Sequence, residues 1–214
     1  MFLGHFALGF AAKRAAPYTS LGTLMAAAQF PDLLWPALVA AGVEQVRIAP
    51  GITAVTPLDF VSYPWSHSLL LVAAWGLLFG GLYWFITRNS RAAVVLGVLV
   101  ASHWVLDFVT HRPDLPLVPH GAPVGLGLWN SVPATLVIES ALFAVGVWMY
   151  AHGTRPLTRT GRWALVWFVV LLAAIYAGNL AGTPPSVPAI WIAGLAGGAL
   201  FVTWAAWIDR HRAR

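Results

Sequence analysis

The chain has no cysteine among its 214 residues, and only 9% of its residues are charged. The absence of cysteine excludes disulfides and thiolate metal sites, so any bound metal must be held by His, Asp, Glu or water. An average soluble domain is about 25% charged, whereas this chain is 59% hydrophobic and has a mean hydropathy of +0.76. The composition excludes an ordinary soluble domain and predicts an integral membrane protein.

Basic residues give the chain a net charge of +5, but they stand singly or in small groups at the ends of apolar segments. This distribution is typical of charge that sets membrane topology, and it lacks the basic stripe of a nucleic-acid surface. We therefore predict the lipid bilayer as a partner and no nucleic acid. No feature of the sequence indicates an oligomeric state.

The opening segment, MFLGHFALGFAAKR, carries its charges after the apolar stretch instead of before it. It also lacks a small-residue cleavage site, so we do not expect a secretory signal peptide. Its roughly 12 apolar residues are too few to cross a hydrocarbon core of about 30 Å. The segment therefore predicts a short, half-inserted helix.

The later apolar stretches predict an all-α polytopic membrane bundle of about six transmembrane helices, each with about 20 or more mostly apolar residues. The predicted spans are residues 19–43, 65–87, 92–111, 126–151, 162–182 and 187–208. No linker or internal repeat divides the chain, so we expect a single membrane domain over residues 1–214. Its motifs lie within residues 1–140.

Positive charge predicts the orientation of these spans. If the spans alternate, four basic groups fall on one side: Lys13 and Arg14; Arg88 and Arg91; Arg155, Arg159 and Arg162; and Arg210, Arg212 and Arg214. The opposite side has only Arg47 and Arg112. The positive-inside rule then places the C-terminus in the cytoplasm of a multi-pass protein, which we expect in a bacterial inner membrane.

Three of the seven acidic residues, Asp32, Asp107 and Glu139, lie near the middle of predicted spans. A carboxylate at the centre of a membrane helix costs about 2.5–3.5 kcal/mol on insertion scales. We therefore expect these carboxylates to face one another or a cation. Pro31 and Pro36 flank Asp32 and each removes a backbone donor, so the helix is expected to bend there.

Two histidines share the span of Asp107. His103, Asp107 and His111 are spaced i, i+4, i+8, which places them within an arc of about 80° on one helix face. The H-x-x-x-D spacing allows an imidazole nitrogen and a carboxylate oxygen from adjacent turns to bind one cation. The spacing alone is common, but its position inside a span makes it a candidate metal motif.

Two further histidines are predicted at similar depth. His5 rises toward the middle of the membrane if the first helix starts from its basic end, and His67 lies at the outer end of its span. Each histidine alone is as readily explained as an ordinary interior or interfacial residue. Beside His67, Ser66 or Ser68 is a candidate to hydrogen-bond a ligand or to cap the span.

Polar residues in the predicted loops receive simpler interpretations. Glu44 and Asp59 are expected to be loop charges, and Arg112 is expected to form a loop ion pair or cap with Asp114. Arg112, at the outer mouth, is also a candidate to hold a substrate phosphate. Asn130 is expected either to contact a substrate or to cap its span.

Four segments in this order, GHFALG, FPDLLWP, WSHSLL and SHWVLDFVTHRPDLPL, resemble the YdjM-like inner-membrane metal-dependent hydrolases over roughly residues 1–140. The pattern is also remotely similar to that of zinc-dependent phospholipase C. This likeness implies metal ligands at His5, Asp32, His67, His103 and Asp107, with His111 as a further ligand. Glu139 matches the end of an H-x-x-x-E pair whose histidine is replaced here by Thr135.

We therefore expect a zinc-dependent hydrolase that acts on a phosphoester or ester of a lipid or lipid-linked substrate. Asp32, as general base or bridging ligand, and Asp107 are the expected catalytic carboxylates. Two alternatives remain open. One is an ion- or proton-coupled transporter, which the lack of an inverted repeat disfavours. The other is a non-catalytic membrane protein with a structural metal site.

Overall fold

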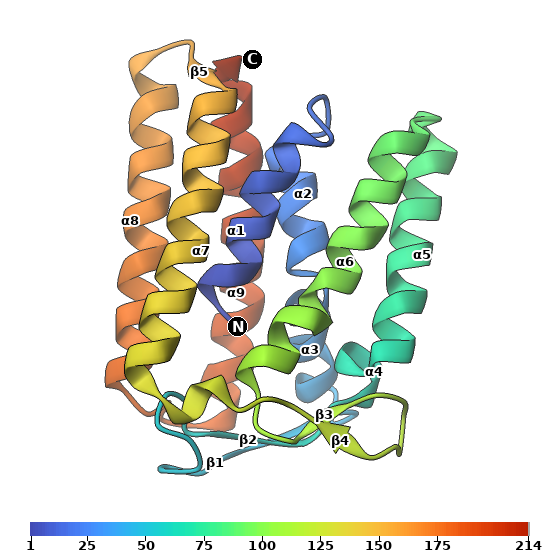
Figure 1. The fold of residues 1–214 in the computed structure, drawn as a ribbon, viewed down its shortest axis with the longest axis vertical. Helices are drawn as coiled ribbons and strands as arrows, with labels where there is room; N and C mark the ends of the chain where they lie inside the picture. Colours follow the sequence, from blue (N-terminus) through green and yellow to red (C-terminus); the bar gives the residue numbers. More distant parts are fainter. Residues whose placement is uncertain (214) are drawn as a thin grey trace.

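The computed structural model describes residues 1–213, and apolar helices form most of it. Five of the described helices are long and apolar enough to cross a membrane: α5 (Leu69–Thr87), α6 (Ser90–Thr110), α7 (Val132–Gly153), α8 (Arg159–Ala181) and α9 (Val187–Arg210). Each overlaps one predicted span. Figure 1 shows α5 and α6 on one side and α7, α8 and α9 on the other, with the shorter helices of residues 3–40 between the two groups. The predicted all-α polytopic bundle is confirmed.

The first predicted span, 19–43, is divided into two short helices, α2 (Leu21–Ala28) and α3 (Phe30–Ala40). Gln29 ends one helix and begins the next, with non-helical backbone angles of φ −100° and ψ 7°. Pro31 has no N–H to continue the hydrogen-bond ladder from α2, so a new helix starts at this point. The break is sharper than the predicted bend, and it places Asp32 in the first turn of α3.

The predicted short N-terminal helix is α1 (Leu3–Ala11), followed by a 3₁₀ turn, η1 (Ala12–Arg14). It lies between α6 and α7, and the N-terminus lies partway along the bundle (Figure 1). Phe6 and Phe10 are fully buried, so protein encloses this helix. Gly146 of α7 permits the close approach, because a Cβ at this position would collide with the backbone of Ala7.

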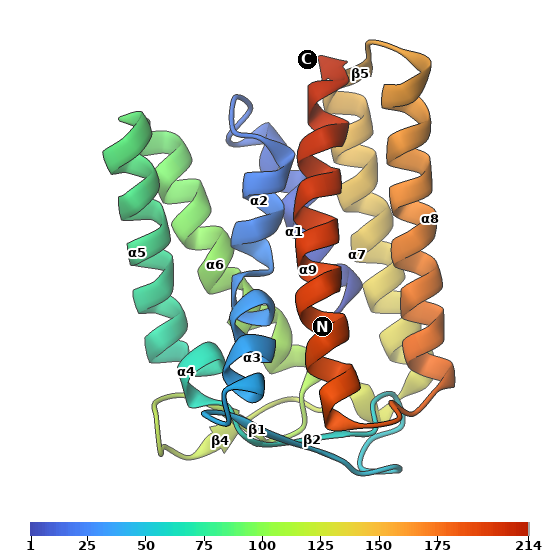
Figure 2. The same ribbon diagram turned by 180° about the vertical axis from the view of Figure 1, so that it is seen from behind.

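Short strands and loops close the two ends of the bundle, as Figures 1 and 2 show. One end, here called the loop end, holds α4 (Pro64–His67), η2 (Leu128–Asn130) and two antiparallel pairs, β1 (Gln45–Ile48) with β2 (Leu58–Ser62) and β3 (Leu115–Pro116) with β4 (Pro123–Val124). The opposite end, here called the C-terminal end, holds β5 (Arg155–Pro156) paired with β6 (Arg212–Ala213).

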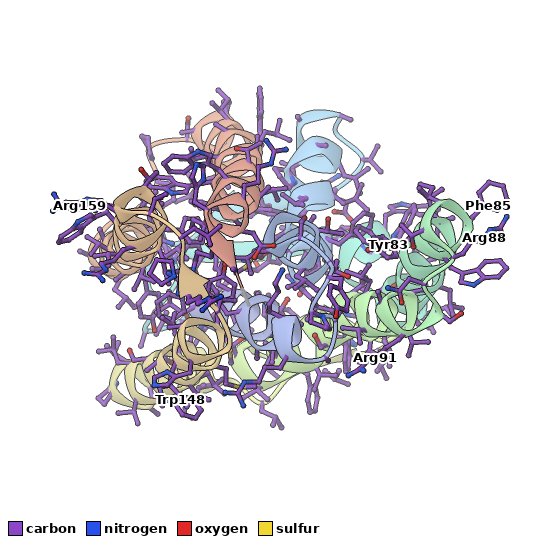
Figure 3. The ribbon with its side chains drawn as sticks, turned by 90° about the horizontal axis from the view of Figure 1, so that it is seen from above. Tyr83, Phe85, Arg88, Arg91, Trp148 and Arg159 are labelled. Atoms are coloured by element: carbon purple, nitrogen blue, oxygen red, sulfur yellow. The ribbon has the colours of Figure 1, made fainter. Side chains whose placement is uncertain are left out.

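Basic side chains gather at the C-terminal end. Figure 3 looks down on this end and labels Arg88, Arg91 and Arg159. Lys13, in η1, contacts Asp209 near the end of α9, and Arg212 lies in β6, so both belong to this end as well. The helices therefore alternate as the span count predicts. Arg214, which belongs to the last predicted basic group, lies outside the described residues.

Two apolar cores hold the helices together. One joins α2 and α3 to the α5–α6 hairpin, and the other joins α1, α2, α7, α8 and α9. Gly76 of α5 faces the backbone of Gly97 of α6, and a Cβ there would come within 2.7 Å of the Gly97 carbonyl oxygen. The outer face of α5 exposes large apolar side chains such as Leu77 and Leu78, as expected of a surface against lipid.

Candidate metal centre

Helix α6 presents His103 and Asp107 on one buried face, one turn apart. His103 Nε2 lies 3.1 Å from Asp107 Oδ2. The other ring nitrogen, Nδ1, lies 2.9 Å from the carbonyl oxygen of Ala28. Because a carbonyl oxygen only accepts hydrogen bonds, this contact places a proton on Nδ1 and leaves Nε2 as the free ligand atom. Without a proton, Nε2 cannot donate to Asp107 Oδ2, and among residues 1–213 it has no hydrogen-bond partner.

Asp107 stands at the centre of a group of bases. His5 Nε2 lies 3.0 Å from its Oδ1, and His67 Nε2 lies 3.7 Å from its Oδ2. The amino group of Met1 also forms an ion pair with Oδ1. The rings of His5 and His103 stack, with centroids 3.6 Å apart. One carboxylate thus links three imidazoles from separate segments of the chain.

Asp32 joins this group from α3. Its Oδ1 lies 3.5 Å from His67 Nε2 and 3.7 Å from His103 Nε2. Its side chain is 43% exposed, whereas those of the histidines are almost fully buried. The break at Gln29 starts α3 here, so that Asp32 lies in the first turn of a new helix. Asp32 is therefore the accessible carboxylate of the group.

The five side chains, here called the His–Asp cluster, are His5, Asp32, His67, His103 and Asp107. Two sets of three have ligand atoms within 4.8 Å of one another: His5, His103 and Asp107, and Asp32, His67 and His103. His103 has a single free nitrogen, so the two sets share one donor atom. Imidazole nitrogen and carboxylate oxygen are ordinary zinc ligands. The donor set and the unpartnered Nε2 of His103 fit a divalent metal.

A cavity of about 740 Å³ opens beside the His–Asp cluster. Asp32, His67 and Asp107 line its polar part. Much of the remaining wall is apolar and comes from α1, α8 and α9, including Phe2, Phe6, Ile175, Leu180, Ile190, Ala193 and Phe201. Ligand pockets commonly have this size and this combination of a mostly apolar wall with a few convergent polar groups.

A family model described as YdjM inner membrane protein matches residues 1–183. The chain belongs to this family. The match continues past residue 140, where the recognisable motifs end, through α7 and α8 to the loop before α9. Comparison with curated proteins and with solved structures gave no match. Family membership, the candidate spans and the buried His and Asp groups together describe an inner membrane protein with a possible metal site.

In this YdjM family protein, His111 lies beside the His–Asp cluster but outside the two sets of candidate ligands. Its Nδ1 lies 2.9 Å from Asp114 Oδ1, and its ring contacts Trp129 at a centroid distance of 4.3 Å. The Tyr63 hydroxyl donates to the same Asp114 oxygen at 3.2 Å. Burial, together with the charge of Asp114, raises the pKa of Tyr63 well above its usual range, so the hydroxyl remains a donor.

Glu139 of α7 has a different local role from the other predicted ligands. Its Oε2 accepts a hydrogen bond of 2.7 Å from the backbone N–H of Leu3. Leu3 begins α1, where backbone N–H groups lack intrahelical partners, so a carboxylate there satisfies the helix N-terminus. Glu139 lines the cavity but is not part of either set of candidate ligands. It positions α1, and with it His5.

The two predicted substrate contacts are less available than the sequence suggests. Arg112 Nη2 lies 2.5 Å from Asp59 Oδ1, and its Nε lies 3.0 Å from Asp114 Oδ2. A substrate phosphate would compete with both carboxylates. Asn130 is exposed in η2; the described residues that line the cavity include its neighbour Trp129 but not Asn130.

Sequence reasoning missed one acidic residue close to the site. Glu44 reads as a loop charge, yet it is only 1% exposed and contacts Ser66, the neighbour of His67. Gln29 and Trp129, which line the cavity, carried no sequence signal that singled them out. The signal for Glu44 was weak because its partner lies 22 residues away, beyond the β1–β2 hairpin.

Proposed function

We propose that this protein is a membrane-embedded, metal-dependent hydrolase that cleaves a phosphoester or ester of a lipid or lipid-linked substrate. One observation carries the proposal: five His and Asp side chains converge inside a membrane protein, and three of them line a large, mostly apolar cavity. A structural site alone would not need such a cavity beside it. An ion pathway would not need the apolar wall of this cavity.

Zinc is the metal that we propose. The cluster offers nitrogen and oxygen donors without thiolates, and imidazole with carboxylate is a common catalytic zinc set. When bound, such a metal acidifies water to a pKa of about 7 and polarises a phosphoryl or acyl oxygen. His5, His103 and Asp107 would hold it, because their buried ligand atoms lie within 4.8 Å of one another and three protein ligands leave a position for water. His67, which belongs to the other set, would be a further ligand.

Asp32 is the proposed general base. Its carboxylate is the exposed one and faces the cavity, so it can accept a proton from an attacking water molecule at a substrate held there. His111, with its ring against Trp129, lines the same cavity and is proposed as a further ligand or substrate contact.

The shape of the cavity supports a lipid substrate. The headgroup would lie at the His–Asp cluster, and the hydrocarbon chain would extend along the apolar walls of α8 and α9. By the positive-inside rule, we place the C-terminal end in the cytoplasm of a bacterial cell. The cluster and the loop end then face the outer half of the inner membrane, where lipid-linked substrates are accessible.

Elemental analysis of the purified protein, combined with an assay against a panel of lipid phosphoesters and esters, tests the proposal. We expect nearly one transition metal or more per chain and hydrolysis that a chelator abolishes. Asp32→Asn should lower turnover by about 100-fold or more, the usual contribution of a general base. A folded protein without metal would contradict the proposal. Ion flux into proteoliposomes in the absence of metal would favour a transporter instead.

A further inference from the structure

Glu44 is a fully buried carboxylate that lies outside the His–Asp cluster. It follows α3 and precedes β1, and only 1% of its surface is exposed. Both of its oxygens accept hydrogen bonds from Ser66: the backbone N–H donates to Oε1 at 2.9 Å, and the hydroxyl donates to Oε2 at 2.6 Å. A buried carboxylate is costly unless it is hydrogen-bonded in this way.

The same serine contacts His67. Ser66 Oγ lies 2.7 Å from His67 Nδ1. A hydroxyl has a single proton, and in Ser66 that proton points to Glu44. Ser66 Oγ must therefore accept the hydrogen bond from His67, which places a proton on Nδ1. A neutral imidazole has only one N–H, so Nε2 carries the lone pair, and Nε2 is the nitrogen that faces Asp32 and Asp107.

We propose that Glu44 is a positioning residue that acts through Ser66 to fix the tautomer and the ring orientation of His67. The chain Glu44–Ser66–His67 holds Nε2 of His67 in the cluster as a ready ligand atom. His103 is held in the same tautomer by the carbonyl oxygen of Ala28. Metal-binding histidines almost always donate their other N–H to such a partner. The predicted effect of Glu44 and Ser66 on metal binding rests on the proposed function. The predicted tautomer of His67 does not.

The tautomer is measurable in the metal-free protein by long-range ¹H–¹⁵N correlation of labelled histidine at alkaline pH. The His67 signals are those that disappear in His67→Gln. In the wild type we expect the Nδ1–H tautomer. Ser66→Ala should shift His67 toward Nε2–H, because the acceptor of the Nδ1 proton is lost. Ser68→Ala is the matched control, since Ser68 is equally buried and its hydroxyl has no hydrogen-bond partner in the described chain.

Glu44→Gln provides a second route if Ser66→Ala folds poorly. The amide keeps the shape of the side chain, but its NH₂ group would donate to Ser66 Oγ and free the hydroxyl proton to turn toward His67. We again expect a shift toward Nε2–H. A wild-type His67 that carries its proton on Nε2, or a tautomer that neither substitution changes, would overturn the proposal.

Metal affinity provides an independent measurement. Competition with a chelator for Zn²⁺ should show that Ser66→Ala and Glu44→Gln bind the ion about 10–100-fold more weakly, as for other partners of metal-binding histidines. Ser68→Ala should bind as the wild type does. Unchanged affinity in both variants contradicts the role of Glu44 in presenting the ligand. If the wild type shows the expected tautomer but binds no metal, the positioning role stands and the proposed function fails.

Discussion

Two buried clusters of charged side chains lie in this molecule, and they differ in how completely their charges are matched. At the C-terminal end, the Lys13 ammonium contacts Asp209 at 2.5 Å and the carbonyl oxygen of Thr19 at 2.8 Å. Asp209 also accepts hydrogen bonds from the Leu21 N–H at 3.2 Å and the Tyr150 hydroxyl at 3.1 Å. This Lys13–Asp209 cluster fastens α9 to α7 and to the α1–α2 turn.

The His–Asp cluster is hydrogen-bonded less completely. Two carboxylates meet three imidazoles and the Met1 ammonium, and within the described chain His5 Nδ1 and His103 Nε2 are buried without a hydrogen-bond partner. It also borders the cavity, whereas the Lys13–Asp209 cluster does not contribute to the cavity wall. The Lys13–Asp209 cluster, whose charges are paired, stabilises the fold. The His–Asp cluster, which is incompletely paired and borders a cavity, is available to a ligand.

Asp107→Asn should have the largest effect. Asparagine keeps the shape of the side chain but removes the charge of the one carboxylate that lies near all three imidazoles of the cluster. We expect metal affinity to fall about 1,000-fold or more, which corresponds to about 4 kcal/mol and exceeds the loss typical of outer partners. Metal content of the purified variant is the measurement, with circular dichroism to establish that it folds. If Asp107→Asn keeps the metal content of the wild type, the His–Asp cluster does not depend on Asp107 to bind metal, and the contrast with the Lys13–Asp209 cluster is lost.

Asp209→Asn tests the other side of the comparison. It leaves the buried Lys13 ammonium without a counter-charge, and breaking a buried ion pair in this way costs about 3–5 kcal/mol. We expect about 3 kcal/mol, because the two side chains retain 10% and 14% exposure. Unfolding of the detergent-solubilised protein measures this loss, and metal content should not change.

A double variant supplies the control for Asp209→Asn. Replacing Lys13 with Met and Asp209 with Leu leaves no buried charge, so much of the lost stability should return. If the double variant is as unstable as the single one, the loss comes from packing and from the lost hydrogen bonds of Leu21 and Tyr150, and not from an unmatched charge. If Asp209→Asn also loses metal, the two clusters are coupled and the comparison fails.

Helical periodicity explains which parts of the site were predictable. The i, i+4 spacing of His103 and Asp107 follows from the helix alone, and the structure places both on one buried face. His111 has the same spacing but follows the last residue of α6, where the backbone leaves the helical region. Its side chain therefore turns to Asp114. The i, i+4 spacing predicts a shared face only within the helix, and His111 lies beyond its end.

Other parts of the site depend on contacts that no local pattern contains. Glu139 is predicted to face a cation or another carboxylate. Its hydrogen bond to Leu3, at the start of α1 and more than 100 residues earlier in the chain, has no counterpart in the local sequence. Glu44 meets Ser66 only because the β1–β2 hairpin returns the chain. The apolar wall from α8 and α9 carries no motif, since any apolar side chain serves there.

Gly178→Leu should have the smallest effect, and it tests whether the cavity serves the His–Asp cluster. Gly178 lines the cavity, and a Cβ added there meets nothing within 4 Å. The new side chain is expected to occupy space meant for a hydrocarbon chain. Displacing two methylene groups at about 0.8 kcal/mol each corresponds to about a tenfold loss in kcat/KM for a long-chain lipid phosphoester.

Two controls show whether such a loss arises in the cavity. Gly81→Leu places the same side chain in equally open space on α5, outside the cavity wall, and should leave kcat/KM unchanged. A water-soluble aryl phosphoester has no long chain, so Gly178→Leu should hydrolyse it at the wild-type rate. Equal losses for the long-chain and the soluble substrate would mean that the substitution disturbs the His–Asp cluster itself. No loss for either would mean that the apolar wall does not bind substrate, and the cavity would no longer distinguish the two clusters.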